Sequence, residues 1–594
     1  MKYWSLPGAS AMFTIAVMFL LHAMIPPVAM AAIVEHTFVV SQVKMTHLCN
    51  ETLATVVNGQ FPGPTIEVTE GDSVTVYVVN KSPYNLTIHW HGVKQRLNCW
   101  ADGVPMITQC PILPNHNFTY RFNVAGQEGT LWWHAHTSFL QATVHGAIII
   151  RPRHGPNSYP FPKPHKEIPI IIGEWWQIDL AQADLDIANS VDVYFSASTI
   201  NGKLGDLYNC SGTPENGYML DVEPGKTYLL RVINAALFAE YYLKIAGHKF
   251  TVVAADANYV SPYTTDVIAI APGETLDALV VADAAPGRYY MVALPTQSPE
   301  PDPQSPVLIS RGIVQYQNLE KPGNSPSTDM PMAPEMPDNK DLIPSFYFHA
   351  NLTSLAQHPH QSPVPTRVDE HMFITLSLGS TCRRGGSSCK RSGSNESVTV
   401  ATMNNVSFQQ PAVAAPLLEL HYHNSSSMDM LQDLPDKPPR VFNYTDPTLI
   451  PPGPEEAKLE PTAKATLARR FRQGAVVEVV FQGTALLQSE SNPMHLHGHD
   501  VFVLAQGEGI YDPARDTARY NLVNPAIKNT VHVPRLGWVA IRFVADNPGI
   551  WYMHCHFGFH QTMGMVGLFI VEDGTTVDTS LPAPPVDFLT CGHI

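Results

Sequence analysis

The sequence predicts an all-β fold made of three Greek-key β-sandwiches in tandem, and three observations carry this prediction. At 594 residues the chain is too long for one ordinary hydrophobic core. Charged residues make up only 15% of it, whereas glycine (38) and proline (52) are numerous, which suits short strands joined by many turns. A pattern of alternating apolar residues between glycine turns also occurs three times along the chain.

Each copy of this repeat contains an early strand and a later strand, and both follow a glycine. The early strand follows Gly71, Gly225 and Gly474 in the three copies, and the later strand follows Gly129, Gly287 and Gly549. Period-2 alternation with β-branched and aromatic residues is typical of strands in sandwiches. The first and third copies lead to paired histidines, whereas the middle copy lacks them and is expected to be structural.

The repeat divides the mature chain into three predicted domains, 32–153, 164–318 and 343–594. A Pro- and Ser-rich stretch at 300–337 indicates an interdomain connection. The broken stretch 383–397 indicates an exposed loop. We expect metal ligands in the first and third domains and none in the second.

The N-terminus predicts a cleaved secretory signal over residues 1–31. Lys2 precedes a largely apolar run from Ala9 to Ala23, and the small-residue pattern Ala29-Met30-Ala31 follows it. No later apolar stretch is long enough to span a bilayer, so we expect no membrane anchor. A high density of Asn-x-Ser/Thr acceptors supports export as an extracellular glycoprotein: Asn50, Asn80, Asn85, Asn117, Asn209, Asn351, Asn395, Asn405, Asn424 and Asn443.

Charge and cysteine content narrow the partners and the compartment. The formal net charge of -16 opposes binding to nucleic acid, because no long basic tract compensates for it. A small basic group within 383–391 is predicted to lie on a solvated loop closed by a Cys382–Cys389 disulfide. Export to an oxidising compartment predicts that most of the 8 cysteines form disulfides.

Four His-x-His pairs are the strongest functional pattern in the chain: His89/His91, His134/His136, His495/His497 and His554/His556. Residues two apart on a strand point to the same face, so each pair presents two imidazoles side by side. One such pair is weak evidence, because structural histidines are commoner than ligands. Four pairs at predicted strand ends, divided between the first and last domains, predict a shared metal site.

Cys555 identifies the metal as copper. It lies between His554 and His556, so its side chain emerges on the opposite face of the strand and reaches a different ion. His560 and Met565 follow it, and a thiolate, an imidazole and a distant thioether describe a blue-copper electron-transfer centre. Such a centre, joined through one strand to a polynuclear site, suits one-electron oxidation. Zinc is redox-inert, so a zinc or cupin-like site leaves Cys555 unexplained.

These motifs resemble the multicopper oxidases, and among them the plant laccases. The resemblance covers essentially the whole mature chain, and four segments that look like the family's copper signatures occur in the family's order. These are His89-Trp90-His91-Gly92, Trp133-His134-Ala135-His136, Pro493-Met494-His495-Leu496-His497-Gly498 and His554-Cys555-His556-Phe557-Gly558-Phe559-His560, together with Trp100-Ala101-Asp102-Gly103. It implies three cupredoxin-like domains, secretion to the apoplast and a monomer.

The resemblance also implies a role for each ligand. His89 and His495 would hold a type 2 copper, and Cys555 and His560, with Met565 axial, would hold a type 1 copper. A type 3 pair would be held by His91, His134, His136, His497, His554 and His556. Asp102 matches an acidic residue thought to assist proton delivery. The implied reaction oxidises phenols such as lignin precursors and reduces dioxygen to water, with four copper ions as cofactors.

Two positions depart from the family's pattern. Asn492 stands where the family has a second type 1 imidazole, and an amide is a poor copper ligand beside imidazole. Gly558 stands where the family has a carboxylate, and glycine cannot relay a proton. We therefore hypothesise that the trinuclear centre assembles while electron entry is slowed.

Disulfide pairing also follows from the resemblance, which implies Cys49–Cys210 and Cys110–Cys591 beside the local Cys382–Cys389 pair. Cys99 is left over, either as a buried thiol or as an intermolecular handle, and the buried alternative is favoured.

Two alternative functions remain open at this point. One is oxidation of ascorbate or of metal ions on the same copper scaffold, because the axial ligand tunes the potential and loops set the substrate. The other is a secreted copper-binding glycoprotein with impaired oxidase activity, to which Asn492 and Gly558 point.

Overall fold

The structure is a computed structural model of the chain and describes residues 31–155, 157–210, 213–296, 308–317, 330–356, 362–382, 397–449, 462–487, 491–589 and 591. The predicted signal peptide lies outside these residues except for Ala31, as do Cys389, Asn395 and the basic group at 383–391. None of the helices in the described part of the chain is long and apolar enough to cross a membrane.

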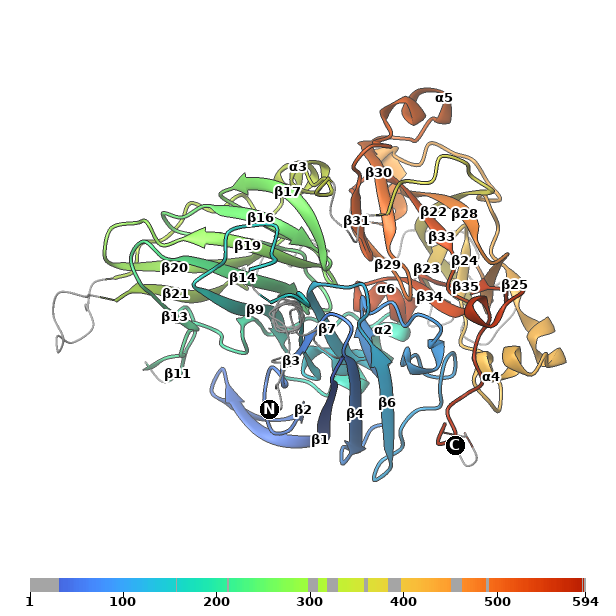
Figure 1. Cartoon of the computed structure of the whole chain (residues 1–594), viewed down its shortest axis with the longest axis horizontal. Coiled ribbons are helices and arrows are strands. Elements are labelled where there is room, and N and C mark those ends of the chain that lie inside the picture. Colours follow the sequence, from blue (N-terminus) through green and yellow to red (C-terminus); the bar gives the residue numbers. More distant parts are fainter. Residues whose placement is uncertain are drawn as a thin grey trace, which may run out of the picture.

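Three β-sandwiches follow one another along the chain, which confirms the predicted fold class (Figure 1). The first packs two four-stranded sheets, and in the early strand Val74, Val76 and Val78 are fully buried while the residues between them face outward. The order in one sheet is β2 (Asn50–Val57), β1 (Ile33–His47), β4 (Ser73–Asn80) and β6 (Asn117–Asn123). The order in the other is β3 (Ile66–Thr69), β8 (His145–Arg151), β7 (Gly129–Ala135) and β5 (Ile88–His91).

The second sandwich has a six-stranded and a five-stranded sheet. The larger has the order β10 (Ala197–Ile200), β9 (Lys166–Trp175), β14 (Thr227–Asn234), β19 (Thr275–Val281), β16 (Phe250–Ala255) and β17 (Asn258–Thr265). The smaller has the order β13 (Met219–Val222), β21 (Ser310–Tyr316), β20 (Arg288–Pro295), β15 (Tyr241–Ile245) and β18 (Ile268–Ile270). A separate hairpin joins β11 (Asn209–Cys210) to β12 (Thr213–Pro214).

The third sandwich has an eight-stranded and a six-stranded sheet. The larger has the order β26 (Ala463–Ala465), β24 (Val406–Phe408), β23 (Ser397–Met403), β22 (Glu370–Cys382), β28 (Ala475–Gly483), β33 (Gly537–Ala545), β30 (Val501–Glu508) and β31 (Ala526–Lys528). The smaller has the order β25 (Gln432–Asp433), β27 (Leu467–Phe471), β35 (Val566–Val571), β34 (Gly549–Cys555), β29 (Asn492–Leu496) and β32 (Thr530–Val533).

Short helices connect the strands and fill the spaces between the sandwiches. The α-helices are α2 (Leu180–Ala188), α3 (Ile343–Ala350), α4 (Leu417–Tyr422), α5 (Pro513–Asp516) and α6 (Gly558–Met563). The 3-10 helices are η1 (Cys99–Ala101), η2 (Ser138–Ala142), η3 (Ser426–Met430), η4 (Pro447–Leu449), η5 (Ala485–Leu487), η6 (Thr517–Arg519) and η7 (Val577–Thr579). Asp179 caps α2, because its carboxylate accepts the backbone N–H groups of Ala181 and Gln182.

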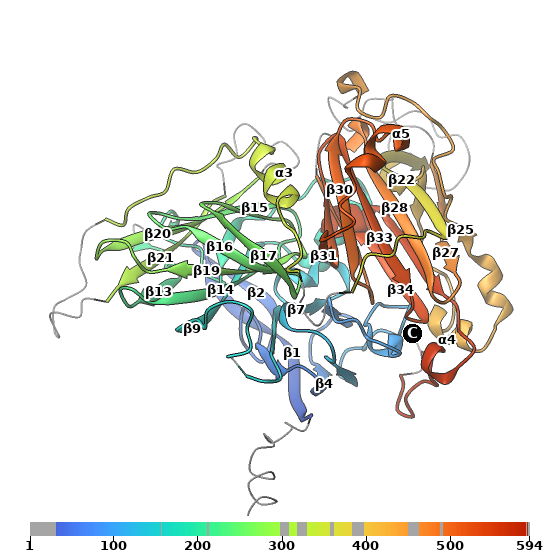
Figure 2. The same ribbon diagram turned by 45° about the horizontal axis from the view of Figure 1, so that its top comes forward.

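The three sandwiches meet around a common centre, so residues far apart in the sequence become neighbours. In both views the first sandwich, in blue, lies below the second, in green, and the third, in orange and red (Figures 1 and 2). Strand β7 of the first sandwich packs against β14 and β19 of the second, and η1 packs against β34 of the third. Helix α2 lies beside both η2 and α6.

Two disulfides fasten this arrangement, and both pairings are the expected ones. Cys49–Cys210 joins the first sandwich to the second, and Cys110–Cys591 joins the first to the C-terminal segment. Cys382 is disulfide-bonded as well, although Cys389 lies outside the described residues. Cys99 is a buried thiol that donates to the Ile550 carbonyl (3.2 Å), so the intermolecular alternative for it is wrong.

One predicted glycosylation acceptor is wrong. The side chain of Asn80 is fully buried and donates to the carbonyls of Tyr84 (2.7 Å) and Ile112 (2.8 Å), so the folded protein cannot carry a glycan there. The motif does not distinguish a surface acceptor from a buried amide that satisfies the backbone. The other acceptors within the described residues are exposed: Asn50, Asn85, Asn117, Asn209, Asn351, Asn405, Asn424 and Asn443.

A buried arginine holds the first and second sandwiches together. Arg231 on β14 is 1% exposed and bonds to Asp277 (2.9 Å), Glu167 (2.9 Å) and, across the domain interface, the Thr130 hydroxyl on β7 (2.8 Å). The Thr130 hydroxyl in turn donates to Asp277. Removing the guanidinium would leave the buried Asp277 carboxylate without its counter-charge, whereas Glu167 would keep Arg151 (3.4 Å).

We expect Arg231→Leu to lower the free energy of unfolding by about 3–5 kcal/mol, the cost typical of stranding one partner of a buried ion pair. The measurement is chemical or calorimetric unfolding of the purified protein. Lys44→Ala is the control, because Lys44 and Glu51 pair at 70% and 55% exposure and such surface pairs contribute about 1 kcal/mol or less. Equal stabilities for the two variants would contradict the role assigned to Arg231.

Candidate metal centre

Strand pairing places the four His-x-His motifs opposite one another. In the first sandwich β5 pairs antiparallel with β7, and His89 lies opposite His134. In the third sandwich β29 pairs antiparallel with β34, and His495 lies opposite His554. Because residues two apart share a face, each strand pair presents its imidazoles on the side that faces the other sandwich.

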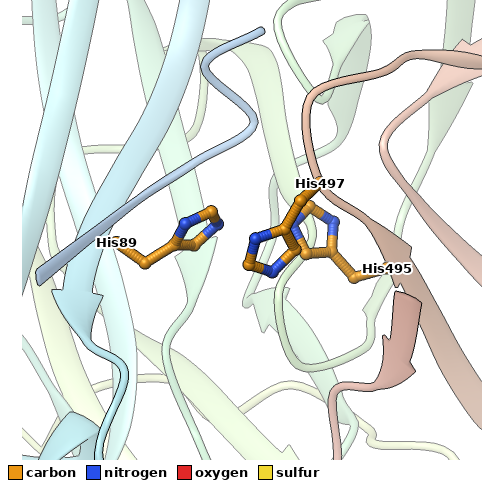
Figure 3. A group of neighbouring side chains, drawn as sticks. All are labelled: His89, His495 and His497. Carbon is orange, nitrogen blue, oxygen red and sulfur yellow. The ribbon is translucent and has the colours of Figure 1, made fainter. Parts of the chain in front are cut away.

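The structure brings all eight imidazoles of these motifs into one buried cluster, here called the imidazole cluster. Across the domain boundary the ring of His89 stacks on that of His497 (centroids 3.8 Å apart), and the ring of His91 stacks on that of His495 (3.7 Å). His89 approaches from one sandwich and His495 and His497 from the other (Figure 3). None of the eight side chains is more than 7% exposed.

Burial favours the neutral form of seven of the eight imidazoles, and several ring nitrogens of the cluster have no hydrogen-bond partner. Burial, reinforced by the neighbouring imidazoles, lowers the pKa of His91, His134, His495, His497, His554 and His556 well below 6.5. Burial and His89 also lower the pKa of His136 to about 3. Buried ring nitrogens without a hydrogen-bond partner include Nε2 of His89, His134, His136 and His495 and Nδ1 of His91.

Backbone and carboxylate acceptors set which ring nitrogen is free. His89 Nδ1 donates to the Asp102 carbonyl (2.7 Å), and His497 Nδ1 donates to the Asp102 carboxylate (2.9 Å). His554 Nδ1 donates to the Cys555 carbonyl (2.9 Å). The Nε2 atoms of His497 and His554 then face each other at 3.3 Å with no proton between them. Such facing lone pairs repel unless a cation lies nearby, so the donors fit metal ions.

The middle sandwich closes the cluster from the third side. Gly273 (φ +92°) lies directly against two of the imidazoles, since a Cβ built on it would lie 2.8 Å from the His556 ring and 3.2 Å from the His91 ring. Its carbonyl accepts from Trp132 Nε1 (3.1 Å). The predicted structural role of this domain therefore includes forming one wall of the metal centre, which no histidine motif indicates.

A second group of donors, here called the sulfur site, lies on the opposite face of β34. Cys555 Sγ lies 3.5 Å from His560 Nδ1 and 3.6 Å from the Asn492 side-chain oxygen. Met565 is fully buried, and its carbonyl accepts from the Cys555 backbone N–H (3.1 Å). Burial lowers the pKa of His560 to about 3, so this imidazole is also neutral. A thiol, an imidazole and an amide oxygen therefore adjoin one another, next to the backbone of a buried methionine.

A side chain at Gly558 would require Leu237 to shift. A Cβ at this position would lie 2.8 Å from Leu237 Cδ2 and 3.4 Å from the Phe139 ring. Gly558 borders a cavity of about 830 Å³ that is also lined by His134 and His136. The cluster thus borders a cavity that is open to solvent on this side.

The structure contains one further buried group that no sequence motif revealed, here called the interface charge cluster. Its members, from the second and third sandwiches and α3, are Glu240, Asp256, Glu274, His349, Lys528 and His532. Glu240, His349 and His532 offer ligand atoms within 4.8 Å of one another. The His349 and His532 rings are stacked almost parallel (3°, centroids 4.2 Å apart), however, so their in-plane lone pairs do not converge on one ion.

The interface charge cluster is instead an ion-pair network. His349 donates from both ring nitrogens, to the Ser345 carbonyl (2.8 Å) and to Glu274 (3.0 Å), as an imidazolium does. Burial lowers the pKa of His349, but the charges of Glu274 and Glu240 outweigh this effect and leave the pKa above 6.5. Lys528 bonds to Asp256 and Glu274, both at 3.1 Å.

Comparisons with known proteins agree with the fold and the donor set. Multicopper oxidase domain families match residues 39–155, 166–318 and 433–575. Two laccases of Oryza sativa subsp. japonica are similar along the chain: laccase-15 is 66% identical over 95% of both chains, and laccase-19 is 56% identical over 95% of this chain and 94% of its own.

Solved structures show the same fold at lower identity. The laccase from Botrytis aclada has a TM-score of 0.68 at 23% identity and covers 93% of this chain and 89% of its own. Fet3p, a multicopper oxidase that functions in iron import, has a TM-score of 0.67 at 20% identity and covers 91% and 90%.

The three sandwiches and the imidazole cluster between the first and the third define a copper-dependent oxidoreductase, and the chain belongs to the multicopper oxidase family. Copper is therefore the metal of the site. Within the family the chain groups with the plant laccases.

We expect Gly273→Ala to weaken copper binding at the imidazole cluster by about 10–100-fold, the range seen when groups supporting metal ligands are changed. The reason is that the methyl group displaces His556 or His91. Copper retention against a competing chelator is the measurement. Gly225→Ala is the matched control, because Gly225 has the same left-handed backbone (φ +75°) in the same sandwich and nothing within 4 Å of its Cβ position. Equal copper loss in both variants would attribute the effect to backbone strain alone.

We expect the stability contributed by His349 to depend on pH. Its folded-state pKa is raised, so its ion pair with Glu274 contributes fully below 6.5 and is lost as pH rises through the raised value. The difference in melting temperature between the wild type and His349→Gln should be largest below pH 6.5 and should shrink above it. His165→Gln, which removes a partly exposed pair with Glu223, serves as the control. A difference that does not vary with pH would contradict this charge state.

Proposed function

We propose that this laccase is a secreted, monomeric enzyme that oxidises phenols related to lignin precursors, one electron at a time, at the sulfur site. One observation carries the proposal: Cys555 lies on the opposite face of β34 from His554 and His556, so one strand joins the sulfur site to the imidazole cluster. All eight imidazoles come from one chain, which supports a monomer. The exposed Asn-x-Ser/Thr acceptors and the expected signal at 1–31 support secretion.

The proposed ligand sets follow the resemblance. His89 and His495 would bind a type 2 copper, and the remaining six imidazoles of the cluster would bind a type 3 pair. Cys555, His560 and Met565 would bind a type 1 copper, with Asn492 beside them. When bound, copper supplies reversible one-electron chemistry at the sulfur site and binding and reduction of dioxygen at the cluster.

The protein's own groups prepare these sites in three ways. Burial keeps the imidazoles unprotonated, so their lone pairs are available at neutral pH without competition from protons. Asp102 fixes the orientation of His89 and His497 through their Nδ1 protons, which supports it as a positioning residue. Thioether and thiol groups in a dry environment favour the soft copper(I) state at the sulfur site.

Asn492 is the feature that distinguishes this sulfur site. Its amide oxygen is a weaker and harder donor than an imidazole nitrogen, so we propose that copper is held more weakly there and that electron entry is slowed. The same oxygen accepts from the Cys555 thiol at 3.6 Å. This contact stabilises the protonated thiol, which must lose its proton before copper binds.

The proposal is tested by copper analysis and absorption spectroscopy of the purified, copper-loaded protein. We expect more than two coppers per chain, with a weak blue band from the thiolate-bound copper. Asn492→His should strengthen that band and raise phenol turnover by at least about tenfold, the effect that even outer-shell changes have on metal sites. Asn492→Leu, which removes the amide without adding an imidazole, should not strengthen the band.

A full-strength blue band in the wild type, unchanged in Asn492→His, would overturn the proposed weakness of the sulfur site. Assays with phenols, ascorbate and ferrous iron on the same preparation identify the donor. Turnover of ascorbate or iron with no turnover of phenols would overturn the proposed substrate.

A further inference from the structure

Reduction of dioxygen to water consumes protons, and the imidazole cluster cannot provide them. Each dioxygen molecule takes up four electrons and four protons to form two water molecules, and four phenols supply the electrons. Burial favours the neutral form of seven of the cluster's eight imidazoles, and the Nδ1 protons of His89, His497 and His554 are held by carbonyl or carboxylate acceptors. Asp102 is fully buried. The protons must therefore reach the cluster from solvent.

The cavity of about 830 Å³ beside the cluster provides the route. Both His134 and His136 lie on its wall, the cavity is open to solvent, and residues of all three domains line it. Among the described residues that line it, Asp184 is the one acidic side chain and Lys464 the one lysine or arginine. Burial lowers the pKa of Lys464, so it favours the neutral form more than an exposed lysine does.

Two hydroxyl groups hold the Asp184 carboxyl group in place. Asp184 lies on α2, which packs against η2 and α6. It accepts hydrogen bonds from the Thr562 hydroxyl on α6 and from the Ser138 side chain on η2. Ser138 is two residues from His136, and both line the cavity together with Asp184.

The environment of Asp184 suits a group that takes up and releases a proton. Its side chain is partly buried, and burial raises its pKa above 3.8 even though the two hydroxyl donors oppose the rise. A carboxyl group with a raised pKa spends more time protonated at mildly acidic pH and is a better proton donor there. Gly558, on the same wall, has no group that could act in its place.

We propose that Asp184 is the proton-relay residue through which solvent protons cross this cavity to dioxygen at the imidazole cluster. In each step the Asp184 carboxyl group gives its proton to a water molecule on the His136 side, and the carboxylate then regains a proton from the solvent side. Four such steps accompany each dioxygen molecule, so protons and electrons balance. The inference rests on the dioxygen reduction of the laccase reaction and adds a residue to it.

The simpler alternative is that Asp184 only ties α2 to α6. That role would need hydrogen-bond acceptors but no exchangeable proton. Asp184→Asn retains an acceptor oxygen and the side-chain volume, and it removes the titration. Asp186→Asn is the matched control, because Asp186 lies on the same helix, accepts from Gln182 (2.7 Å) and does not line the cavity.

The decisive measurement is the reaction of pre-reduced protein with dioxygen. Copper-loaded wild type, Asp184→Asn and Asp186→Asn are fully reduced with dithionite, which bypasses electron entry at the sulfur site, and are then mixed with dioxygen. We expect reoxidation of Asp184→Asn to be slower by about 100-fold, within the range that general acid–base groups contribute. The control should match the wild type. Equal rates for all three proteins would overturn the relay.

A second measurement uses copper-free protein and needs no activity. The infrared difference spectrum between the wild type and Asp184→Asn should contain the band of a protonated carboxyl group that titrates above the pH of an ordinary aspartate. Absence of that difference would show that Asp184 does not exchange a proton, which would also overturn the proposal. If phenol turnover fails while dithionite-reduced wild type still reacts with dioxygen, the proposed substrate is wrong and the relay is unaffected.

Discussion

The stacking of imidazoles across the boundary between the first and third sandwiches is the contact on which the rest of the structure depends. His89 on His497 and His91 on His495 are pairs of stacked rings from segments about 400 residues apart in sequence. They meet only if β5 and β7 face β29 and β34 with the correct register. A shift of one residue in any of these strands would turn its ligands to the other face.

The remaining architecture holds that register in place. The middle sandwich supplies no imidazole to the cluster, yet Gly273 lies against two of its rings and Asp256 accepts the backbone N–H groups of Asn529 and Thr530. The Asn529 carbonyl in turn orients His495. Arg231 secures the middle sandwich to the first, and the interface charge cluster secures it to the third. Each sandwich thus constrains the positions of the other two.

The imidazole cluster could be predicted from the sequence because strand periodicity determines which of its side chains share a face. Strand periodicity makes each His-x-His pair share a face, and the same rule puts Cys555 on the other face of β34. Features that depend on three-dimensional packing could not be predicted this way. Asn80 satisfies the acceptor motif, but its amide is used inside the fold. His349 and His532 belong to no motif, because they meet only through the contact between two domains.

The same limit applies to Asp184 and to the wall formed by Gly273. Nothing near Asp184 in the sequence suggests chemistry, since its partners Ser138 and Thr562 lie 46 residues before it and 378 residues after it. Gly273 lies in an ordinary Pro-Gly turn. Gly273 matters because it has no side chain at the point where the rings of His91 and His556, from the other two domains, approach it. That approach exists only in the folded protein.

The Cys110–Cys591 disulfide limits how far the first and third sandwiches can separate, and so affects how copper can be lost from the imidazole cluster. It closes a loop of 481 residues that contains the second and third sandwiches and strands β6, β7 and β8 of the first. If thermal motion separates the third sandwich from the first, the two halves of the cluster remain tethered and at high effective concentration. Copper loss through such an opening would then be a local event that re-docking can reverse, and reducing agents would be expected to make it permanent.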